Sequence, residues 1–208
     1  MYDHFKMTSA NIEEVPHFKI VMLGNSGVGK TAMVSRISED VFSEQHVPTV
    51  GAQFVAMNMN VNGNNCVLEL WDTAGQEVFR SLVGFYIRES KGAFILCDVT
   101  DAESFDVLPK WVSFINENSA GTQIIIFANK IDKADERVVN TTVLQEFANS
   151  CDVKFIEGSA KTGEGIRDAF ELMADFVWSA SHTSDQIAID TNDVNISGPA
   201  PQKKKCCK

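Results

Sequence analysis

Residues 24–31 read Gly-Asn-Ser-Gly-Val-Gly-Lys-Thr, and this stretch fits the phosphate-loop pattern G-x-x-x-x-G-K-[ST]. The apolar run Phe18–Leu23 precedes it and predicts a strand, and a helix is expected to begin near Lys30. Glycines let the backbone curl around an anion with its N–H groups pointing inward, and a helix N-terminus adds a favourable dipole. Lys30 supplies a positive charge for the β and γ phosphates, and Thr31 offers a hydroxyl to Mg²⁺. The loop indicates a nucleoside triphosphate without distinguishing ATP from GTP.

The apolar segments that flank this loop predict a mostly parallel sheet. Phe18–Leu23, Ala93–Cys97 and Ile124–Ala128 are short, nearly continuous apolar runs, which suit strands buried on both faces. Two later segments repeat apolar residues at helical spacing. These residues are Phe105, Leu108, Val112 and Ile115 in the first, and Ile166, Phe170, Met173 and Val177 in the second. The fold class is therefore α/β, with helices on both faces of the sheet.

One segment breaks the parallel pattern. Residues 55–61 alternate apolar side chains with small or polar ones, Asn62-Gly63 follows, and a second strand runs on to Trp71. Alternation marks a strand with one solvent-facing side, and Asn-Gly is a strong signal for a two-residue hairpin turn. We therefore expect an antiparallel hairpin at one edge of the sheet.

The chain divides into three segments by composition. Residues 1–16 are polar and form a short flexible extension, residues 17–178 hold every regular apolar pattern, and residues 179–208 lack aromatic side chains. The last segment is rich in Ser, Asp, Asn and Pro, so we expect it to be disordered because it cannot bury enough surface to offset its ordering entropy. No run reaches the roughly 18 apolar residues that a spanning helix needs. Because the N-terminus also lacks a secretory signal, we expect a cytosolic protein.

Charge and cysteine content narrow the function further. The formal net charge of −10 over 208 residues argues against nucleic acid as a general partner, because phosphate backbones need a basic surface. Hydrophobic residues make up 44% of the chain, which is ordinary for a protein with a packed core. Cys66, Cys97 and Cys151 lie within or beside apolar segments, and we interpret them as buried side chains rather than as a reactive or metal site.

Two polar segments that follow predicted strands indicate a guanine site. Asn129-Lys130-Ile131-Asp132 comes directly after the apolar run Ile124–Ala128, and strand C-termini are where ligands bind in open α/β sheets. Asp132 can accept both hydrogen bonds from the N1 and 2-amino edge of guanine. Adenine has no such pair of donors and would leave the carboxylate unpaired, at a cost of about 1–3 kcal/mol or more. Ser159-Ala160-Lys161, after a short strand over 153–156, supplies a second loop toward the base.

A third polar segment, Asp72-Thr73-Ala74-Gly75-Gln76-Glu77, follows the strand that reaches Trp71. An aspartate at a strand end suits a Mg²⁺ ligand that acts through a water molecule. Gly75 lets its N–H approach a γ-phosphate, and Gln76 can orient the attacking water, a recurring role in phosphoryl transfer.

The order GNSGVGKT, PTVG, WDTAGQE, NKID and SAK resembles that of the Ras superfamily of small GTPases over about residues 17–178, and its details look most like the Rab branch. Ser26 in the phosphate loop, residues 76–81 and the signature from Asp98 to Phe105 carry the likeness to that branch. The resemblance implies a G domain of the P-loop NTPase class, with a six-stranded, mostly parallel sheet and one antiparallel edge strand. It also implies a switch that binds GTP or GDP with Mg²⁺ and hydrolyses GTP slowly.

The resemblance assigns roles to individual residues. Thr49 in Pro48-Thr49-Val50-Gly51 is the switch threonine whose hydroxyl and carbonyl meet Mg²⁺ and the γ-phosphate. It implies Gln76, Lys30 and Thr49 as the catalytic set, and Thr31, Thr49 and, through water, Asp72 as the metal set. It implies Phe54, Trp71 and Tyr86 as an aromatic triad that faces effectors.

The implied contacts with the nucleotide extend over the whole site. Phe42 lies against the guanine, Lys130 packs beside it, and Ala160 offers it a backbone N–H. The nucleotide-binding residues are Asn25, Ser26, Gly27, Val28, Gly29, Lys30, Thr31, Ala32, Phe42, Thr49, Gly75, Asn129, Lys130, Asp132, Ser159, Ala160 and Lys161.

The chain departs from the Rab pattern at three places. Val78 replaces a usual arginine, Ala52-Gln53 replaces an aliphatic residue and an aspartate before Phe54, and Gly158 replaces a threonine before Ser159. The first two lie on surfaces that partners read, so they bear on partner identity. None removes a group that contacts phosphate or Mg²⁺.

The C-terminal residues Lys203-Lys204-Lys205-Cys206-Cys207-Lys208 resemble the paired-cysteine endings of Rab proteins, which carry two geranylgeranyl chains. A C-a-a-X signal is excluded because the fourth residue from the end is Lys205. One lipid chain binds membranes only marginally, whereas two chains beside basic residues anchor stably. We therefore expect lipidation at Cys206 and Cys207, and a location on the cytoplasmic face of an intracellular membrane with a cytosolic pool.

The partners follow from the resemblance. They are an exchange factor, a GTPase-activating protein, effectors and an escort chaperone of the GDI type for the lipidated tail, and we expect the protein to be a monomer. Three alternatives stay open at this point: a P-loop ATPase or nucleotide kinase, a binding scaffold locked in the GTP state, and a signalling GTPase outside vesicle transport. Competition of ATP with GTP and a hydrolysis assay separate the first two from a GTPase switch.

Overall fold

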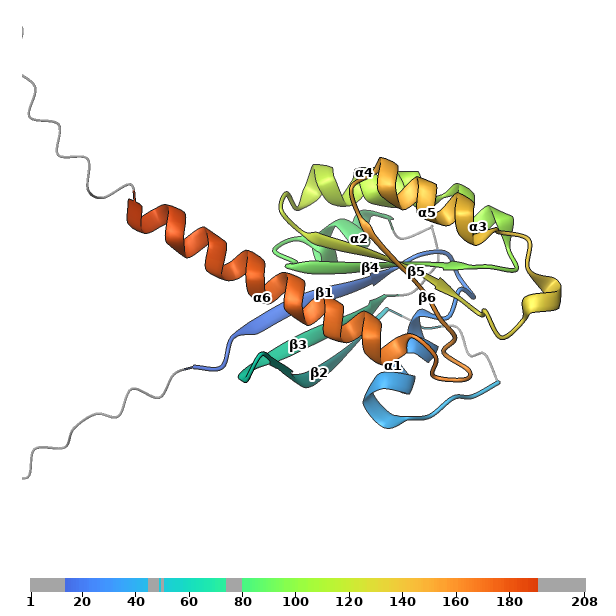
Figure 1. The fold of residues 1–208 in the computed structure, drawn as a ribbon, viewed down its shortest axis with the longest axis horizontal. Helices are drawn as coiled ribbons and strands as arrows, with labels where there is room; N and C mark the ends of the chain where they lie inside the picture. The colour runs from blue at the N-terminus through green and yellow to red at the C-terminus, as the bar shows by residue number, and fades with distance from the viewer. Residues whose placement is uncertain (1–13, 45–48, 50, 74–79, 191–208) are drawn as a thin grey trace, which may run out of the picture.

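The structure is a computed structural model that describes residues 14–44, 49, 51–73 and 80–190. Six strands form one sheet in the order β2-β3-β1-β4-β5-β6 (Figure 1). The strands are β1 His17–Leu23, β2 Ala52–Val61, β3 Asn64–Thr73, β4 Gly92–Asp98, β5 Gln123–Asn129 and β6 Lys154–Glu157. All neighbours pair in parallel except β2 and β3, so the predicted sheet with one antiparallel edge strand is confirmed.

Helices cover both faces of this sheet (Figure 1). Helices α1 and α6 lie on one face, and α2, α3, α4 and α5 lie on the other, which confirms the predicted α/β architecture. Their bounds are α1 Lys30–Glu39, α2 Arg80–Ile87, α3 Ala102–Asp106, α4 Leu108–Asn118, α5 Thr141–Ser150 and α6 Ile166–Asp190, with a short 3-10 helix η2 at Ala134–Glu136.

The edge hairpin forms as the sequence predicts. β2 and β3 stay in antiparallel register from the pair Ala52 and Thr73 to the pair Val61 and Asn64. The turn residues Asn62 and Gly63 have φ values of 52° and 89°. Positive φ at both central positions is what a hairpin turn that matches the strand twist requires, and Asn-Gly adopts it at little cost.

Two hydrophobic cores lie on the two faces of the sheet, and β1 supplies both. Ile20 and Met22 face the core beneath α1 and α6, whereas Val21 and Leu23 face the core beneath α4 and α5. Successive strand side chains point to opposite faces, so a strand covered on both sides must be apolar throughout. This explains the continuous apolar runs that the sequence shows.

Two helical segments differ from their predicted extent. The apolar pattern from Phe105 to Ile115 is shared by α3 and α4, which meet at Val107, and a proline stands in the first turn of α4. Proline lacks an N–H and is tolerated in a first turn but not inside a helix, so the break falls there. The predicted boundary at residue 178 lies inside α6, so residues 179–190 are helical where we expected disorder. Within the described ranges, no helix is both long enough and apolar enough to span a bilayer.

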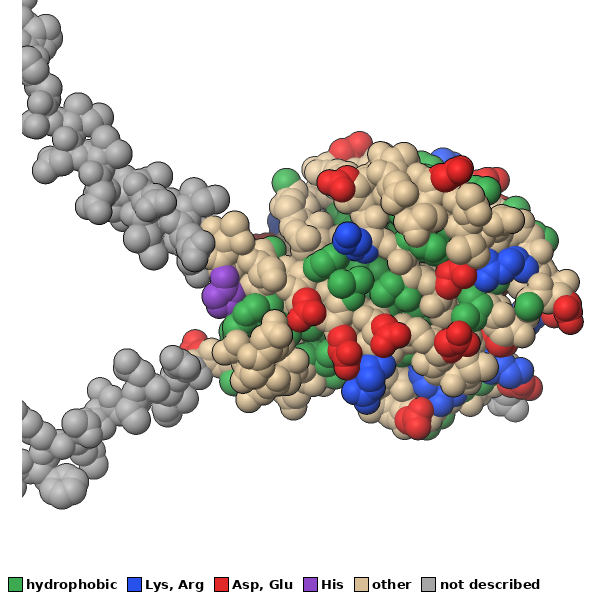
Figure 2. All heavy atoms as spheres, viewed as in Figure 1, with side chains coloured by type: hydrophobic (Ala, Val, Ile, Leu, Met, Phe, Trp, Pro, Cys, Tyr) green, Lys and Arg blue, Asp and Glu red, His purple; other side chains and the backbone are tan. Residues whose placement is uncertain are grey.

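The cysteines among the described residues occupy apolar surroundings. Cys66 and Cys97 are buried, as predicted, whereas Cys151 is only half-buried. Burial raises the pKa of the Cys97 thiol to about 12, with nearby carboxylates adding to the effect. A thiol with so high a pKa stays protonated and unreactive at neutral pH. Figure 2 shows acidic side chains scattered over one face of the molecule with basic ones among them, rather than gathered in one basic patch.

Candidate nucleotide-binding site

The phosphate loop connects β1 to α1, and three of its glycines hold backbone angles that favour glycine. Gly24, Gly27 and Gly29 have φ values of 131°, 80° and 100°. A Cβ atom on Gly24 would lie 2.4 Å from the carbonyl oxygen of Leu96, and one on Gly29 would lie 2.2 Å from Nδ2 of Asn129. Both angle and space therefore exclude a side chain at these two positions, and the loop packs closely against its neighbours.

The side chain of Lys30 folds back and binds the phosphate loop. Its Nζ donates hydrogen bonds of 2.8 Å to the carbonyl oxygens of Gly24 and Asn25, and the side chain is only 5% exposed. Burial lowers the pKa of Lys30 to about 8, although the nearby charge of Asp72 opposes the shift. An anion in the loop would favour the charged form of this lysine, so the site is prepared electrostatically for a phosphate.

Two hydroxyls and one carboxylate meet beside the loop. Thr31 donates a hydrogen bond of 2.6 Å to Oδ2 of Asp72, and its hydroxyl lies 2.8 Å from that of Thr49. The second oxygen of Asp72 is buried without a hydrogen-bond partner. Burial raises the pKa of this carboxyl, while the hydrogen bond from Thr31 and the charge of Lys30 lower it.

This arrangement fits a magnesium ion. Within the described part of the chain, no group of three or more His, Cys, Asp or Glu side chains could hold a metal by itself. Mg²⁺ is usually held by one or two protein oxygens together with substrate phosphates and water. The unpartnered oxygen of Asp72 and the hydroxyls of Thr31 and Thr49 match that requirement, so the predicted metal set lies together beside the phosphate loop.

Asn129 connects the phosphate loop to the loop after β6, the base loop (residues 158–161). Its Nδ2 donates a hydrogen bond of 2.8 Å to the carbonyl oxygen of Val28, and its Oδ1 accepts one of 3.0 Å from the N–H of Ala160. The residue is only 1% exposed. Asn129 therefore holds two segments that are far apart in the sequence at fixed positions on either side of one space.

Asp132 is oriented by the same loop. Its Oδ1 accepts a hydrogen bond of 2.5 Å from the hydroxyl of Ser159. That hydroxyl oxygen in turn accepts the N–H groups of Lys161 and Thr162, each at 3.1 Å. The contact fixes one carboxylate oxygen of Asp132 while the side chain still lines the cavity described next.

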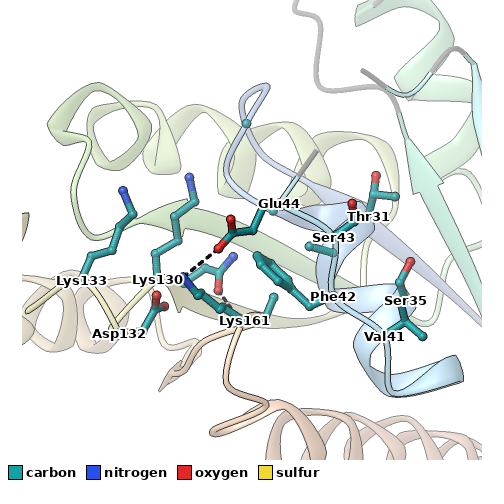
Figure 3. A pocket seen from close by; sticks show the side chains of 15 residues that line it. Thr31, Ser35, Val41, Phe42, Ser43, Glu44, Lys130, Asp132, Lys133 and Lys161 are labelled. Carbon is teal, nitrogen blue, oxygen red and sulfur yellow. Dashed lines mark hydrogen bonds and ion pairs between the residues drawn. The ribbon is translucent and has the colours of Figure 1, made fainter. Parts of the chain in front are cut away.

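A cavity of about 400 Å³ opens between these loops (Figure 3). Its size lies in the range of small-molecule sites. The lining residues are Gly27, Gly29, Thr31, Ala32, Ser35, Val41, Phe42, Ser43, Glu44, Asn129, Lys130, Asp132, Lys133, Ala160 and Lys161. Ten of the predicted nucleotide-binding residues are among them, so segments predicted separately meet around one space.

The remaining predicted site residues fall into three groups. Asn25, Val28, Lys30, Thr49 and Ser159 do not line the cavity but contact residues that do, or the loop that forms its floor. Ser26 belongs to the same loop and is exposed. The predicted residues Gly75, Gln76, Cys206 and Cys207, and the departure Val78, lie outside the described residues. Their roles stay predictions.

Asp98 is a site residue to which sequence reasoning gave no role. It ends β4 opposite Asn129 of β5, and its Oδ2 pairs with Nζ of Lys130 at 2.5 Å. Its Oδ1 accepts hydrogen bonds from both the N–H and the hydroxyl of Thr100. Asp98 is 7% exposed, so its charge is shielded from solvent and holds the lysine beside the base loop. In the sequence, Asp98 is the first residue of the Rab-like signature, and that signature was the feature that could have pointed to it.

The predicted effector triad forms one surface. The ring of Trp71 lies 5.4 Å from that of Phe54 and 5.9 Å from that of Tyr86, centroid to centroid. Phe54 is 52% exposed, and Phe85, which the sequence did not single out, is 70% exposed beside Tyr86. The predicted triad therefore lies together on one partly exposed surface, and its role in binding effectors stays a prediction.

The departure at Gly158 has a structural reason. A Cβ atom there would lie 2.4 Å from the carbonyl oxygen of Glu164 and 2.6 Å from the ring of Phe127. Phe127 is fully buried in the core under α6. The space that a side chain at position 158 would need is therefore filled by a core phenylalanine and by the backbone of the same loop.

Comparison with known proteins agrees with this geometry. The family model described as the Ras family matches residues 19–178. The GTP-binding protein YPT1 of Saccharomyces cerevisiae is 39% identical over 158 residues, which are 76% of this chain and 77% of the yeast protein. The Ras-related protein RabC of Dictyostelium discoideum is 35% identical over 199 residues, which are 94% of this chain and 100% of that protein.

A third relative, the GTP-binding protein ypt1 of Schizosaccharomyces pombe, is 36% identical over 158 residues, 76% of this chain and 78% of its own. The family model covers nearly the whole folded part of the chain, and the relatives are 35% and more identical to it. The chain therefore belongs to the Ras family. It is a small GTPase of the Rab type, and its reaction is the hydrolysis of GTP to GDP and phosphate. The predicted recognition is confirmed.

Adding one methyl group at Gly158 tests the close packing of the base loop. We expect Gly158→Ala to lower the free energy of unfolding by about 1–3 kcal/mol, because the Cβ overlaps backbone and a buried ring. Urea unfolding of the GDP-bound protein measures it. The matched control is Gly84→Ala in α2, where the nearest atom to the new Cβ is 3.8 Å away. Equal stability of the two variants would contradict the account of the departure.

Removing the charge of Asp98 tests how Lys130 is positioned. We expect Asp98→Asn to weaken GDP binding about tenfold, because hydrogen bonds to charged groups contribute about 1.5–3 kcal/mol and Lys130 loses its partner. Equilibrium titration with fluorescent GDP measures this. Competition by inorganic pyrophosphate, which reports on the phosphate loop alone, should stay unchanged. The control Asp106→Asn removes the same charge from an exposed position. A parallel loss of pyrophosphate binding would indicate a general structural defect instead.

Proposed function

We propose that this chain is a Rab-like GTPase that acts as a membrane-anchored switch in vesicle trafficking and recruits effectors in its GTP state. The observation that carries the proposal is a cavity lined both by Asp132, which Ser159 orients, and by the phosphate loop, which Asn129 holds in place. The relatives support the trafficking role because the chain shares the Rab type of GTPase with them. Two are the GTP-binding proteins YPT1 and ypt1, and the third is the Ras-related protein RabC.

Nucleotide binding divides between the two ends of the cavity. At one end, the N-terminus of α1 and Lys30 offset the charge of the phosphates, together with N–H groups that the phosphate loop offers to an anion. At the other end, Asp132 accepts the N1 and 2-amino hydrogens of guanine. Oδ1 of Asp132 keeps its hydrogen bond from Ser159, but an adenine brings no pair of donors to this carboxylate, and an acceptor that the ligand covers without a donor costs about 1–3 kcal/mol. Selection of guanine therefore depends on a penalty against the wrong base as much as on contacts with the right one.

The Asp72 carboxylate and the hydroxyls of Thr31 and Thr49 would hold Mg²⁺, directly or through water. The ion supplies positive charge at the β and γ phosphates when it is bound. Gln76 orients a water molecule toward the γ-phosphorus, and no covalent intermediate forms with the protein. The chain's own contribution to hydrolysis is thus positioning and electrostatic stabilisation.

Hydrolysis is slow without a partner. Among the described residues that line the cavity none is an arginine, and Arg36 already donates to the carbonyl oxygens of Ala160 and Lys161. Comparable switches without an arginine in the pocket turn over at rates on the order of 10⁻⁴ per second, and an arginine supplied by an activating protein accelerates them greatly. We propose that such a protein sets the lifetime of the GTP state here.

The switch depends on contacts with the γ-phosphate. Thr49 and Gly75 hold their two segments only while that phosphate is present, and hydrolysis releases them. Phe54 and Trp71 lie between these segments in the sequence and Tyr86 follows the second one, so effectors that bind this aromatic surface would sense the state of both segments. An exchange factor resets the cycle by opening the site for GTP.

The tail provides the membrane anchor. Cys206 and Cys207 each carry a lipid chain, the flanking lysines add attraction to an anionic leaflet, and an escort protein of the GDI type extracts the lipidated chain. Two chains are needed because a single one gives only marginal, reversible binding.

Base selection is tested by competition with fluorescent GDP in magnesium-containing buffer. We expect unlabelled GTP and GDP to compete strongly and ATP weakly, and we expect Asp132→Asn to weaken GDP binding about 10- to 100-fold, because one acceptor of the guanine edge is lost. The matched control, Asp135→Asn, removes the same charge from an exposed position in η2. Equal competition by ATP and GTP, or no binding of either, would refute the proposed function.

Anchoring is tested in cells with a tagged chain. We expect the double variant Cys206→Ser, Cys207→Ser to move from the membrane fraction to the cytosol, because both attachment points are removed. Cell fractionation and imaging beside organelle markers measure the distribution. Cys151→Ser, which changes a half-buried thiol in the folded domain, is the control and should stay on membranes. Persistent membrane binding of the double variant would exclude the lipid anchor.

A further inference from the structure

We infer that Glu44 and Lys161 form an ion-pair clasp across the open side of the nucleotide cavity, and that this clasp slows the release of bound nucleotide. The inference rests on the proposed function, because it concerns the regulation of the same site. It gives Glu44 a role that no sequence motif assigned to it.

The two residues reach each other from distant segments of the chain. Glu44 follows Phe42 in the segment after α1, and Lys161 lies in the loop after β6. Nζ of Lys161 is 3.1 Å from Oε1 of Glu44, and both side chains line the cavity. Figure 3 shows the two side chains pointing toward each other beside the ring of Phe42. The pair therefore links the two sides of the cavity where the predicted base contacts lie.

The lysine end of the clasp is fixed. The N–H of Lys161 donates to the hydroxyl of Ser159, and its carbonyl oxygen accepts a hydrogen bond of 2.8 Å from Nη2 of Arg36. Ser159 also holds Asp132, so the clasp is built on the loop that orients the guanine acceptor. Glu44 belongs to the segment that carries Phe42, and pairing with a fixed lysine keeps that segment over the cavity.

The exposure of the two side chains determines how strongly the clasp can slow nucleotide release. The side chain of Glu44 is 79% exposed and that of Lys161 is 53% exposed, so water and salt screen the pair. Exposed pairs of this kind contribute little, and their loss changes an equilibrium or rate by about 1.5- to 5-fold. The clasp therefore tunes nucleotide release and does not create the site.

The clasp differs from two other lysine pairs at the cavity. Lys130 pairs with Asp98, whose side chain is only 9% exposed, so added salt should hardly reach that contact. Lys133, which also lines the cavity, pairs with Glu136 on its own segment and so links nothing across the opening. Among the ion pairs of the described residues, the Glu44–Lys161 pair thus combines exposure to salt with a position that spans the cavity.

The experiment measures release of fluorescent GDP from the full chain in magnesium buffer, chased with excess unlabelled GDP, at low and high sodium chloride. We expect Glu44→Gln to release GDP about two- to fivefold faster than the unmodified chain at low salt. The two rates should converge at high salt, because salt weakens the clasp only where it exists. Glu39→Gln, which removes the same charge from an exposed position in α1, should release at the unmodified rate at both salt levels.

Charge reversal keeps the inference falsifiable if a single change perturbs the segment. Glu44→Lys should release GDP faster still, and combining it with Lys161→Glu should bring the rate back toward that of the unmodified chain. Equal rates for Glu44→Gln and the unmodified chain at low salt, or no recovery in the reversed pair, would overturn the clasp. Failure of the unmodified chain to bind guanine nucleotides would instead refute the proposed function, so the two failures are distinguishable.

Discussion

The bridge made by Asn129 is the contact on which the whole site depends. One amide side chain binds the carbonyl of Val28 in the phosphate loop and the N–H of Ala160 in the base loop, and it is shielded from water. Gly29 lacks a side chain because Asn129 occupies the place of its Cβ. A buried amide with both ends satisfied is costly to break, since each freed partner would lose a hydrogen bond in a low-dielectric setting. The bridge therefore fixes the distance between phosphate and base contacts.

The order of the strands makes that bridge possible. In a parallel sheet the carboxyl ends of the strands lie along one edge, so the loops that follow β1, β4, β5 and β6 emerge side by side. Register then decides which residues touch. Asp98 and Asn129 are partners across β4 and β5, which places Lys130, the next residue, within reach of the Asp98 carboxylate. The apolar strands thus determine where polar side chains meet.

Local patterns in the sequence were enough to predict the phosphate loop, the Asn62-Gly63 hairpin and the sheet, because glycine angles, turn chemistry and strand alternation act over a few residues. Contacts between distant segments were beyond such patterns. The sequence marked Gly158 as a departure, but only the packing shows that Phe127 fills the space beside it. Likewise Asp98 belonged to a recognised signature, yet its pairing with Lys130 follows from strand register. The helix break at Val107 was missed because an apolar spacing can continue across two helices.

The site binds an anion although the chain as a whole is acidic. A net charge of −10 should repel an anionic nucleotide, yet at physiological salt such repulsion fades beyond a Debye length of about 8 Å. Closer in, Lys130, Lys133 and Lys161 are each paired with a carboxylate, so Lys30 and the N-terminus of α1 are the positive groups that face the phosphates. Lys30 is held by backbone carbonyls and has a pKa lowered to about 8, so a phosphate relieves the cost of burying its charge. A protein of negative net charge can therefore bind an anionic nucleotide, because the charges nearest the ligand contribute most to the potential at its binding site.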